Sequence, residues 1–384
     1  MTGFLNDFES EVKNLFAEYV HKRIIPLRSQ LDRGDTFPRE IFKEMADQDF
    51  FRVMVPREYG GMGKSQMHIC LGIEELARGD GGISVSYAVD AIAANGIILH
   101  GTEDQKKKYL PAIASGECLT AFAITEPGSG SDVTSLSTRA VPKDGGYALN
   151  GTKQFITNGE IADLVMVIAQ TDRDRGYRGQ TAFLVEKGTP GFSAGKKEDK
   201  MGIRSSVTSE LIFDNCRVPA KAVLGELNRG FYIALHLLDC SRIGIGAQAL
   251  GIAQGALDES VQYARMREQF GKPIGSFQAI QHLLADMATQ IEAARLLVWH
   301  GARIADQDGD QRDLIKISSM AKLLATDTAM KVTTDAVQIF GGYGYTREYP
   351  VEKMMRDAKV TQIYEGTNQI QRNLIAKQLL KDPK

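Results

Sequence analysis

The spacing of apolar residues divides the chain into a helical stretch, a strand-like stretch and a second helical stretch. Residues 1 to about 117 have helical character, interrupted by glycine-rich breaks at 59–63 and 79–82. Thr102 is followed three residues later by Gln105, a spacing typical of a capping box at the start of a helix. We therefore expect the first part of the chain to fold as several separate helices.

The pattern changes between residues 118 and 224, where short apolar runs alternate with polar turns. Residues 164–169 and 182–185 are apolar runs of strand length, and residues 209–213 form a third. Asp214 and Asn215 follow that third run and predict a turn at its end. These features predict a small β domain in the middle of the chain.

Helical periodicity returns after residue 225. Apolar residues recur at steps of three and four in two long stretches, formed by Ile280, Leu283, Leu284, Met287, Ile291, Ala294 and Val298 and by Leu314, Ile317, Met320, Ala321 and Leu324. Ser276 is the expected N-cap of the first of these helices. A succession of long amphipathic helices predicts an antiparallel bundle. The expected fold is mainly α, with a helical domain over 1–117, a middle β domain over 118–224 and a helical bundle over 225–384.

Composition narrows the possible partners and locations. The 46 basic and 48 acidic residues leave a net charge of −2, which provides no field for nucleic acid or an anionic membrane. The apolar runs in the sequence are too short to predict a membrane span. Residues 1–9 contain early acidic residues and no basic-then-apolar signal, so we expect a prokaryotic cytoplasmic protein or a mature matrix protein. The four cysteines lack metal-ligand spacing, and we expect neither a disulfide framework nor a bound metal.

Four segments carry the chemistry, although each of them alone resembles an ordinary polar turn. They are Phe-Ala-Ile-Thr-Glu-Pro-Gly-Ser-Gly-Ser-Asp at 122–132, Gln-Phe-Ile-Thr-Asn-Gly at 154–159, Gln-Ile-Phe-Gly-Gly-Tyr-Gly at 338–344 and Ile-Tyr-Glu-Gly-Thr-Asn-Gln-Ile at 363–370. The sequence has neither a Walker A loop nor the glycine fingerprint of a dinucleotide fold. In this order and at these separations, the four segments resemble the acyl-CoA dehydrogenase family over nearly the whole chain. The resemblance implies an N-terminal helical domain, a barrel-like β domain, a C-terminal four-helix bundle and assembly as a homotetramer.

The resemblance also implies that FAD is the cofactor. Residues expected at the flavin are Phe122, Ile124, Thr125, Ser131, Phe155 and Thr157, with Thr157 near N5. Phe155 stands where many relatives have tryptophan, so this ring can cover the flavin but has no N–H to donate. Residues expected to hold the diphosphate and adenosine of FAD, partly in a neighbouring subunit, are Arg267, Phe270, Gln278, Gln338, Gly341, Gly342, Thr367 and Gln369.

By the same resemblance, Glu365 is the catalytic base in an α,β-dehydrogenation of an acyl-CoA thioester. Glu365 would remove a proton from Cα while hydride passes from Cβ to flavin N5, and its backbone N–H would help to bind the thioester carbonyl. Substrate contacts are expected from Ser131, Asp239, Arg242, Tyr364 and Gly366. Other branches place the base at the position of Ser241, which cannot serve. Residues 84–96 contain no arginine, which disfavours a dicarboxylate substrate.

Asp90 is an acidic residue among apolar neighbours in the segment expected to form the wall of the acyl pocket. One interpretation pairs it with a backbone donor or a helix terminus. The other makes it an additional acid or base that contacts an alicyclic or unsaturated ring acyl group.

The expected function is therefore dehydrogenation of a short, branched or cyclic acyl-CoA, with electron-transferring flavoprotein as the electron acceptor. Three alternatives stay open. The enzyme could run in reverse as an enoyl-CoA reductase, the fold could host a flavin-dependent monooxygenase, or the chain could be a DNA-binding relative. The retained Tyr-Glu-Gly-Thr sequence at 364–367 disfavours the second alternative, and the net charge of −2 disfavours the third.

Overall fold

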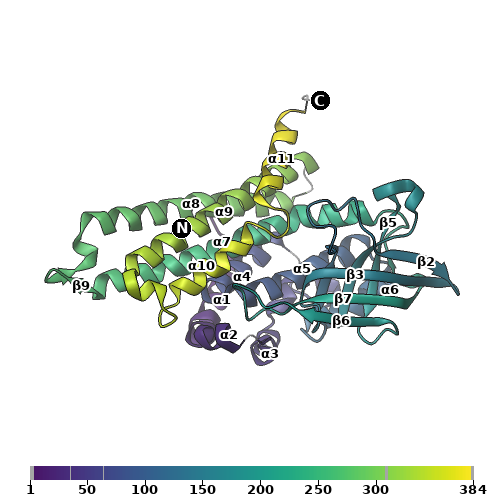
Figure 1. Cartoon of the computed structure of the whole chain (residues 1–384), viewed down its shortest axis with the longest axis horizontal. Helices are drawn as coiled ribbons and strands as arrows, with labels where there is room; N and C mark the ends of the chain where they lie inside the picture. Colours follow the sequence, from purple (N-terminus) through teal and green to yellow (C-terminus); the bar gives the residue numbers. More distant parts are fainter. Residues whose placement is uncertain (1–3, 35, 64, 308–309, 382–384) are drawn as a thin grey trace.

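The fold combines two helical regions with a central β-sheet. The computed structural model describes residues 4–34, 36–63, 65–307 and 310–381. Residues 1–9 were expected to lack a signal sequence, and the first three of them lie outside the described residues. Helices occupy the beginning and the end of the chain, and the sheet lies between them in sequence (Figure 1). The predicted fold class, mainly α with a middle β domain, is confirmed.

The N-terminal helices pack beside the sheet and beneath the long helices of the C-terminal region. They are α1 (Asp7–Tyr19), α2 (Arg28–Gly34), α3 (Arg39–Asp47), α4 (Gln66–Gly79), α5 (Gly81–His100) and α6 (Glu103–Ala114). The predicted capping box is present, because the Thr102 hydroxyl accepts from the Gln105 N–H at 3.3 Å and the Thr102 N–H donates to the Gln105 side chain at 3.0 Å. The break at 79–82 is also real. There, the Asp80 carboxylate accepts from the first N–H groups of α5.

Helix α5 is the central helix of the core. Its 20 residues meet the length and apolarity of a membrane span, contrary to the expectation from short apolar runs. However, 89% of its most apolar window is buried inside the protein, where the helix contacts α4, α7 and the first strand. A helix that is apolar on all sides is expected in such a position. It forms one wall of the site described below.

The strands form one mixed sheet. They are β1 (Thr120–Ala123), β2 (Arg139–Lys143), β3 (Gly146–Thr157), β4 (Leu164–Gln170), β5 (Gln180–Glu186), β6 (Phe192–Lys197), β7 (Thr208–Pro219) and β8 (Val223–Leu224). Their order is β6-β7-β3-β2-β4-β5-β8, with β1 parallel to β4. The predicted turn at Asp214 and Asn215 is wrong, because β7 continues through it. Asn215 instead has a φ of 50°, near a register shift in the pairing with β3.

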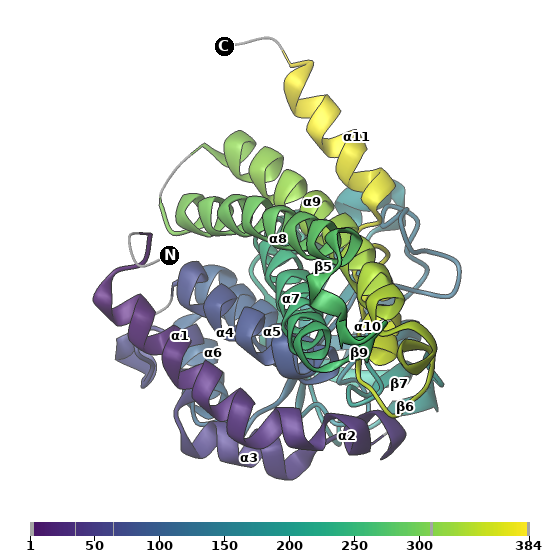
Figure 2. The same ribbon diagram turned by 90° about the vertical axis from the view of Figure 1, so that its left-hand side faces the viewer.

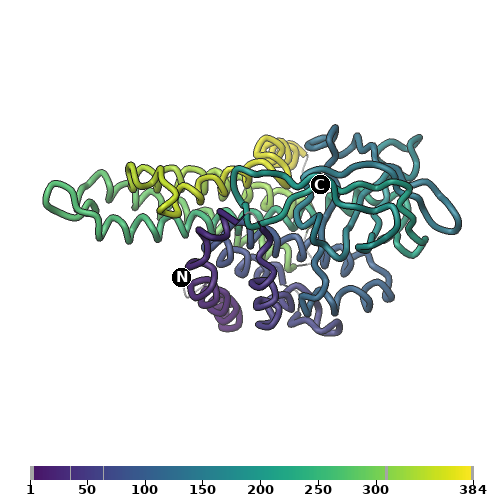
Figure 3. Tube along the Cα trace, turned by 60° about the horizontal axis from the view of Figure 1, so that its bottom comes forward, coloured from purple at the N-terminus to yellow at the C-terminus, as the bar shows by residue number. Residues whose placement is uncertain are grey.

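The C-terminal helices form a bundle that extends away from the sheet (Figure 3). They are α7 (Gly230–Met266), α8 (Gln278–Ala305), α9 (Gln311–Phe340), α10 (Val351–Thr361) and α11 (Asn368–Leu379). Between α7 and α8, the short strands β9 (Glu268–Gln269) and β10 (Lys272–Pro273) form a hairpin at the tip of the bundle. Helix α11 projects away from the rest of the chain (Figure 2).

The predicted N-cap at Ser276 is wrong. Helix α8 begins at Gln278, and Phe277 occupies the cap position without a side-chain hydrogen bond. The Ser276 hydroxyl donates instead to the Pro273 carbonyl at 2.7 Å, inside the short 3₁₀ turn Ile274–Ser276. Serine binds nearby backbone groups in turns as readily as it caps helices, so its presence alone does not decide between the two.

Candidate active site

A cavity of about 250 Å³ lies between α5, the sheet, α7 and the turn that precedes α11. It brings together residues from three of the four motif segments. The residues expected at the flavin or substrate that line it are Phe122, Ile124, Thr125, Ser131, Phe155, Thr157, Arg242, Tyr364, Glu365 and Gly366. Segments separated by more than 200 residues in sequence thus meet at one cavity.

Glu365 presents a carboxylate to this cavity from a tight turn. Its φ is 50° and that of Gly366 is 93°, so two successive residues have left-handed backbone conformations. Such a conformation is costly for a residue with a side chain and indicates that the surroundings hold it. Thr367 then caps α11 by accepting from the Ile370 N–H at 3.3 Å. The Glu365 Oε2 atom is buried and has no hydrogen-bond partner among the described residues.

The electrostatic environment suits a base. Burial raises the pKa of Glu365 above its usual value. The Ser241 hydroxyl and the positive charges of Lys322 and Arg242 oppose this rise without cancelling it. Desolvation therefore outweighs the nearby positive charges and hydrogen-bond donor, and the carboxyl titrates closer to neutral pH than an exposed glutamate does.

Lys322 was not identified from the sequence, although it is fully buried in α9 beside the Glu365 turn. Its ammonium donates to the Gly366 carbonyl and to the Asn368 side chain, both at 2.9 Å. Gln371 donates to the same Gly366 carbonyl at 2.9 Å. The sequence shows only a lysine between Ala321 and Leu323 in a helical stretch, and its burial becomes visible only in the structure.

Tyr364 is held from α7. Its hydroxyl donates to the Gln248 side chain, and the Gln248 amide nitrogen donates to the Gly81 carbonyl at 2.8 Å. Gln248 is fully buried. The turn is therefore tied to both α7 and the start of α5.

A buried ion pair supports the flavin-side wall, and neither member was assigned a role from the sequence. Lys153 in β3 donates to Glu126 at 2.8 Å and to the Ile124 carbonyl at 3.0 Å. Glu126 also accepts from Ser137 and Thr138 on the far side of the loop. The opposite charge and these donors lower the pKa of Glu126 to about 2 although burial opposes the change.

Arg242 and Asp239 play different parts at the cavity. Arg242 lines the cavity, whereas Asp239 lies behind it and accepts from Arg242 and, at 2.9 Å, from Gln311. The cost of burying Arg242 is thus met by a paired carboxylate.

A second, smaller hollow of about 20 Å³ continues past Glu365 between α4, α5 and α7. Ile92 and Glu365 line both spaces. The hollow is otherwise lined by Gln66, Ile69, Ile73, Ala88, Ala91, Asn95, Leu237, Ser241 and Gly244. The Asn95 side chain is buried there, and its Oδ1 has no partner among the described residues.

Asp90 does not reach either space. Its Oδ1 accepts from the Thr120 N–H at 2.6 Å and from the Thr120 hydroxyl at 2.8 Å, so the side chain joins α5 to β1. Burial raises the pKa of Asp90 to about 8. The expectation that Asp90 contacts the acyl group is corrected by this placement, and the alternative pairing with a backbone donor describes what the structure shows.

The residues expected at the diphosphate and adenosine of FAD lie mostly at the other end of the bundle. Arg267, Gly341 and Gly342 line a separate cavity of about 480 Å³ near β9, far from the sheet (Figure 1). Phe270 is 94% exposed at that tip. The remaining expected contacts, Gln278, Gln338 and Gln369, are exposed and line none of these cavities, and Thr367 is the α11 cap. Within one chain, the residues expected at the flavin ring therefore lie apart from most of those expected at the diphosphate and adenosine. A cofactor shared between two subunits would require this separation.

The residues around the Glu365 cavity fit a flavin ring. Phe122, Ile124 and Phe155 provide apolar surface, while Thr125 and Thr157 add hydroxyls at its edge. Phe155, which has a φ of 58°, is 63% exposed in the single chain. An exposed aromatic side chain beside an open cavity is suited to covering a flat ring.

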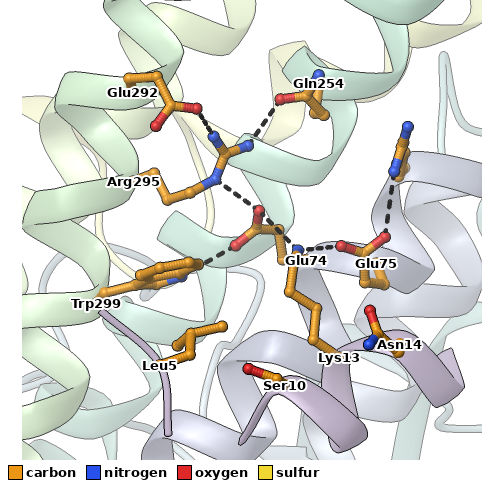
Figure 4. A pocket seen from close by; sticks show the side chains of 11 residues that line it. Leu5, Ser10, Lys13, Asn14, Glu74, Glu75, Gln254, Glu292, Arg295 and Trp299 are labelled. Atoms are coloured by element: carbon orange, nitrogen blue, oxygen red, sulfur yellow. Dashed lines mark hydrogen bonds and ion pairs between the residues drawn. The ribbon is translucent and has the colours of Figure 1, made fainter. Parts of the chain in front are cut away.

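A further cavity, of about 400 Å³, lies between α1, α4, α7 and α8 (Figure 4). Its charged residues are already paired: Arg295 donates to Glu74 at 2.8 Å, and Lys13 pairs with Glu75. The neutral Trp299 side chain also donates to Glu74, at 3.2 Å. These contacts join the N-terminal helices to the bundle. The cavity shares no lining residue with the two spaces beside Glu365, and its paired side chains form a structural network.

Comparison with known proteins covers all three parts of the chain. Residues 6–117 match the acyl-CoA dehydrogenase N-terminal domain, residues 121–216 the middle domain and residues 228–380 the C-terminal domain. An acyl-CoA dehydrogenase of Bacillus subtilis (strain 168) is 48% identical over 96% of this chain and 97% of its own. Acryloyl-CoA reductase (NADH) of Anaerotignum propionicum is 44% identical over 96% of this chain and 94% of its own.

Solved structures agree. Butyryl-CoA dehydrogenase from Megasphaera elsdenii superposes with a TM-score of 0.95 at 44% identity, covering 98% of this chain and 99% of that one. A chain solved in work on the electron transferring flavoprotein of Acidaminococcus fermentans gives a TM-score of 0.96 at 47% identity over 98% and 99%. With three matched domains and relatives that align over nearly its whole length, the chain belongs to the acyl-CoA dehydrogenase family, flavoprotein oxidoreductases that act on acyl-CoA thioesters.

Proposed function

We propose that the protein catalyses the α,β-dehydrogenation of a short, branched or cyclic acyl-CoA, with Glu365 as the base. The observation that carries this proposal is the unpartnered, buried Oε2 of Glu365, which lies at the junction of the two cavities. A thioester spanning that junction would place its Cα–H against this carboxylate. The raised pKa of Glu365 increases its basicity towards a weak carbon acid.

The chain's own residues also prepare the site for the developing enolate. The Glu365 N–H makes no hydrogen bond within the described residues, so it is available to a thioester carbonyl. Lys322 and Gln371 hold the adjoining Gly366 carbonyl and so brace the turn that carries Glu365. FAD, held by the residues around Phe122, Thr125 and Thr157, would supply the hydride-accepting chemistry.

The small hollow beyond Glu365 supports a short acyl group. Its volume of about 20 Å³ leaves room for little beyond the first carbons of the chain. Ala88 and Ala91 are small residues in its lining, and the hollow disfavours long straight chains.

The reverse reaction is the second candidate. A relative named acryloyl-CoA reductase (NADH) shares 44% identity, and one named 3-(aryl)acrylate reductase shares 43%. The same base can return a proton to Cα, so the residues at the site serve either direction. The electron partner would then decide which direction operates.

We further propose that an electron-transferring flavoprotein accepts the electrons, that the chain forms a homotetramer and that it works in the cytoplasm. The separation of the Arg267 cavity from the Glu365 cavity supports an assembly in which a second copy completes the FAD site. If FAD spans two chains, flavin binding and assembly are linked. The bacterial sources of the relatives support the location.

Anaerobic titration of the purified protein with saturated straight, branched and alicyclic acyl-CoAs tests the proposal. Loss of the oxidised flavin absorbance with one short class supports dehydrogenation and identifies that class. If no saturated acyl-CoA changes the spectrum but an enoyl-CoA reoxidises the reduced protein, the reductase direction replaces it.

A further inference from the structure

Lys322 is a buried cation whose charge the reaction as described does not use. Its side chain is fully buried in α9, where an ammonium is costly unless it is well hydrogen-bonded. Its two hydrogen-bond partners among the described residues, the Gly366 carbonyl and the Asn368 side chain, are neutral acceptors at 2.9 Å. The described residues provide it with no direct ion pair.

The surroundings of Lys322 make it part of a fixed network. Asn368 donates to the Asp327 carboxylate at 2.7 Å and to the Thr326 hydroxyl at 2.9 Å. The Gly366 carbonyl receives both Lys322 and Gln371. The network thus fixes the residue directly after Glu365, where the backbone is left-handed.

The charged groups facing Glu365 come from two helices. Arg242 in α7 is paired with Asp239, whose negative charge opposes the field of Arg242 at the carboxylate. Lys322 in α9 lacks such a partner, and Asp327 acts on it only through space. Lys322 is therefore the larger uncompensated positive charge near Glu365.

We propose that Lys322 is a positioning residue for the base: its ammonium holds the Gly366 carbonyl, and its charge keeps Glu365 ionised inside a desolvated site. This inference rests on the proposed role of Glu365. The two actions are linked, because the hydrogen bond to Gly366 keeps the charge beside the turn. Burial lowers the pKa of Lys322 to about 8, so the lysine is still charged at neutral pH.

The test compares Lys322→Met with Lys322→Gln, which retains an N–H donor but carries no charge. Lys331→Met is the matched control, because Lys331 lies on the same helix in an exposed pair with Asp335. Infrared difference spectra of each variant, taken against the same variant with Glu365→Gln, report the titration of the Glu365 carboxyl over a pH series. This readout does not require turnover.

Both Lys322 variants should raise the pH at which Glu365 titrates by about one unit, which corresponds to an about tenfold loss of the ionised form on the acid side. The acid limb of kcat/KM should move by the same amount, while Lys331→Met leaves both unchanged. An unshifted Glu365 titration in a folded Lys322 variant, or an equal shift in Lys331→Met, overturns the inference. If Lys322→Met does not fold, Lys322→Gln decides the question. Full turnover by Glu365→Gln would refute Glu365 as the base. The infrared titration would still show whether Lys322 affects the Glu365 carboxyl.

Discussion

Removing Glu126 tests how the flavin-side wall is held together. Lys153 is 0% exposed, and its side chain would keep only the Ile124 carbonyl as a partner after Glu126→Ala. Breaking a buried ion pair from one side costs about 3 to 5 kcal/mol because it leaves an uncompensated charge. We take about 4 kcal/mol, since Ser137 and Thr138 also lose their acceptor.

The assay is thermal unfolding followed by calorimetry or circular dichroism. An unfolding entropy of about 2.1 cal/mol/K per residue gives about 0.8 kcal/mol/K for this chain, so the loss corresponds to a fall in Tm of about 5 °C. Glu126→Ala combined with Lys153→Met removes both charges and should cost less than Glu126→Ala and Lys153→Met added together. A fall below about 1 °C for Glu126→Ala, or strictly additive changes in the double variant, would refute the reasoning.

Three further outcomes follow from the site. Glu365 has a raised pKa, so kcat/KM should fall on acidification at a pH above that at which an exposed glutamate titrates, and a pH–rate profile checks this. Asp90→Asn should alter turnover equally across an acyl-CoA panel because Asp90 binds Thr120 and not the acyl group; selective loss with ring substrates would contradict its placement. Asn95→Leu should fill the small hollow and lower kcat/KM by about tenfold or more for acyl groups longer than the best substrate, measured with a chain-length series.

Stability should also depend on pH through the ion pair. The folded-state pKa of Glu126 is lowered to about 2, so its contribution is fully present above the ordinary value of 4.5 and is lost as the pH falls towards 2. Glu126→Gln should flatten this part of the stability curve. Parallel curves for the two proteins between those pH values would count against the assignment.

Motif segments could be predicted because they are local. The resemblance assigns several residues around Phe122, Phe155 and Glu365 to the flavin or the substrate. In the structure, these residues line one cavity. Helices and strands with strong periodicity were likewise found at the expected places, such as α9 and β4.

Features that depend on distant partners could not be predicted. Asp90 was expected at the acyl pocket because the resemblance places its segment in the pocket wall. Its neighbours Val89 and Ala91 do line the cavities, but a helical side chain points to one side, and the Asp90 side chain meets β1. The pairing of Lys153 with Glu126 and the role of Lys322 depend on contacts across 27 and 44 residues of sequence. No periodic pattern reports such contacts.

The most direct test of the central claim is the anaerobic reduction of Glu365→Gln by the best acyl-CoA, followed by the oxidised flavin absorbance. Glutamine keeps nearly the same shape but cannot accept the Cα proton. The account predicts that the variant binds FAD and acyl-CoA as the wild-type protein does, yet its flavin stays oxidised on the timescale of wild-type turnover. Reduction at the wild-type rate would contradict the assignment of Glu365 as the base.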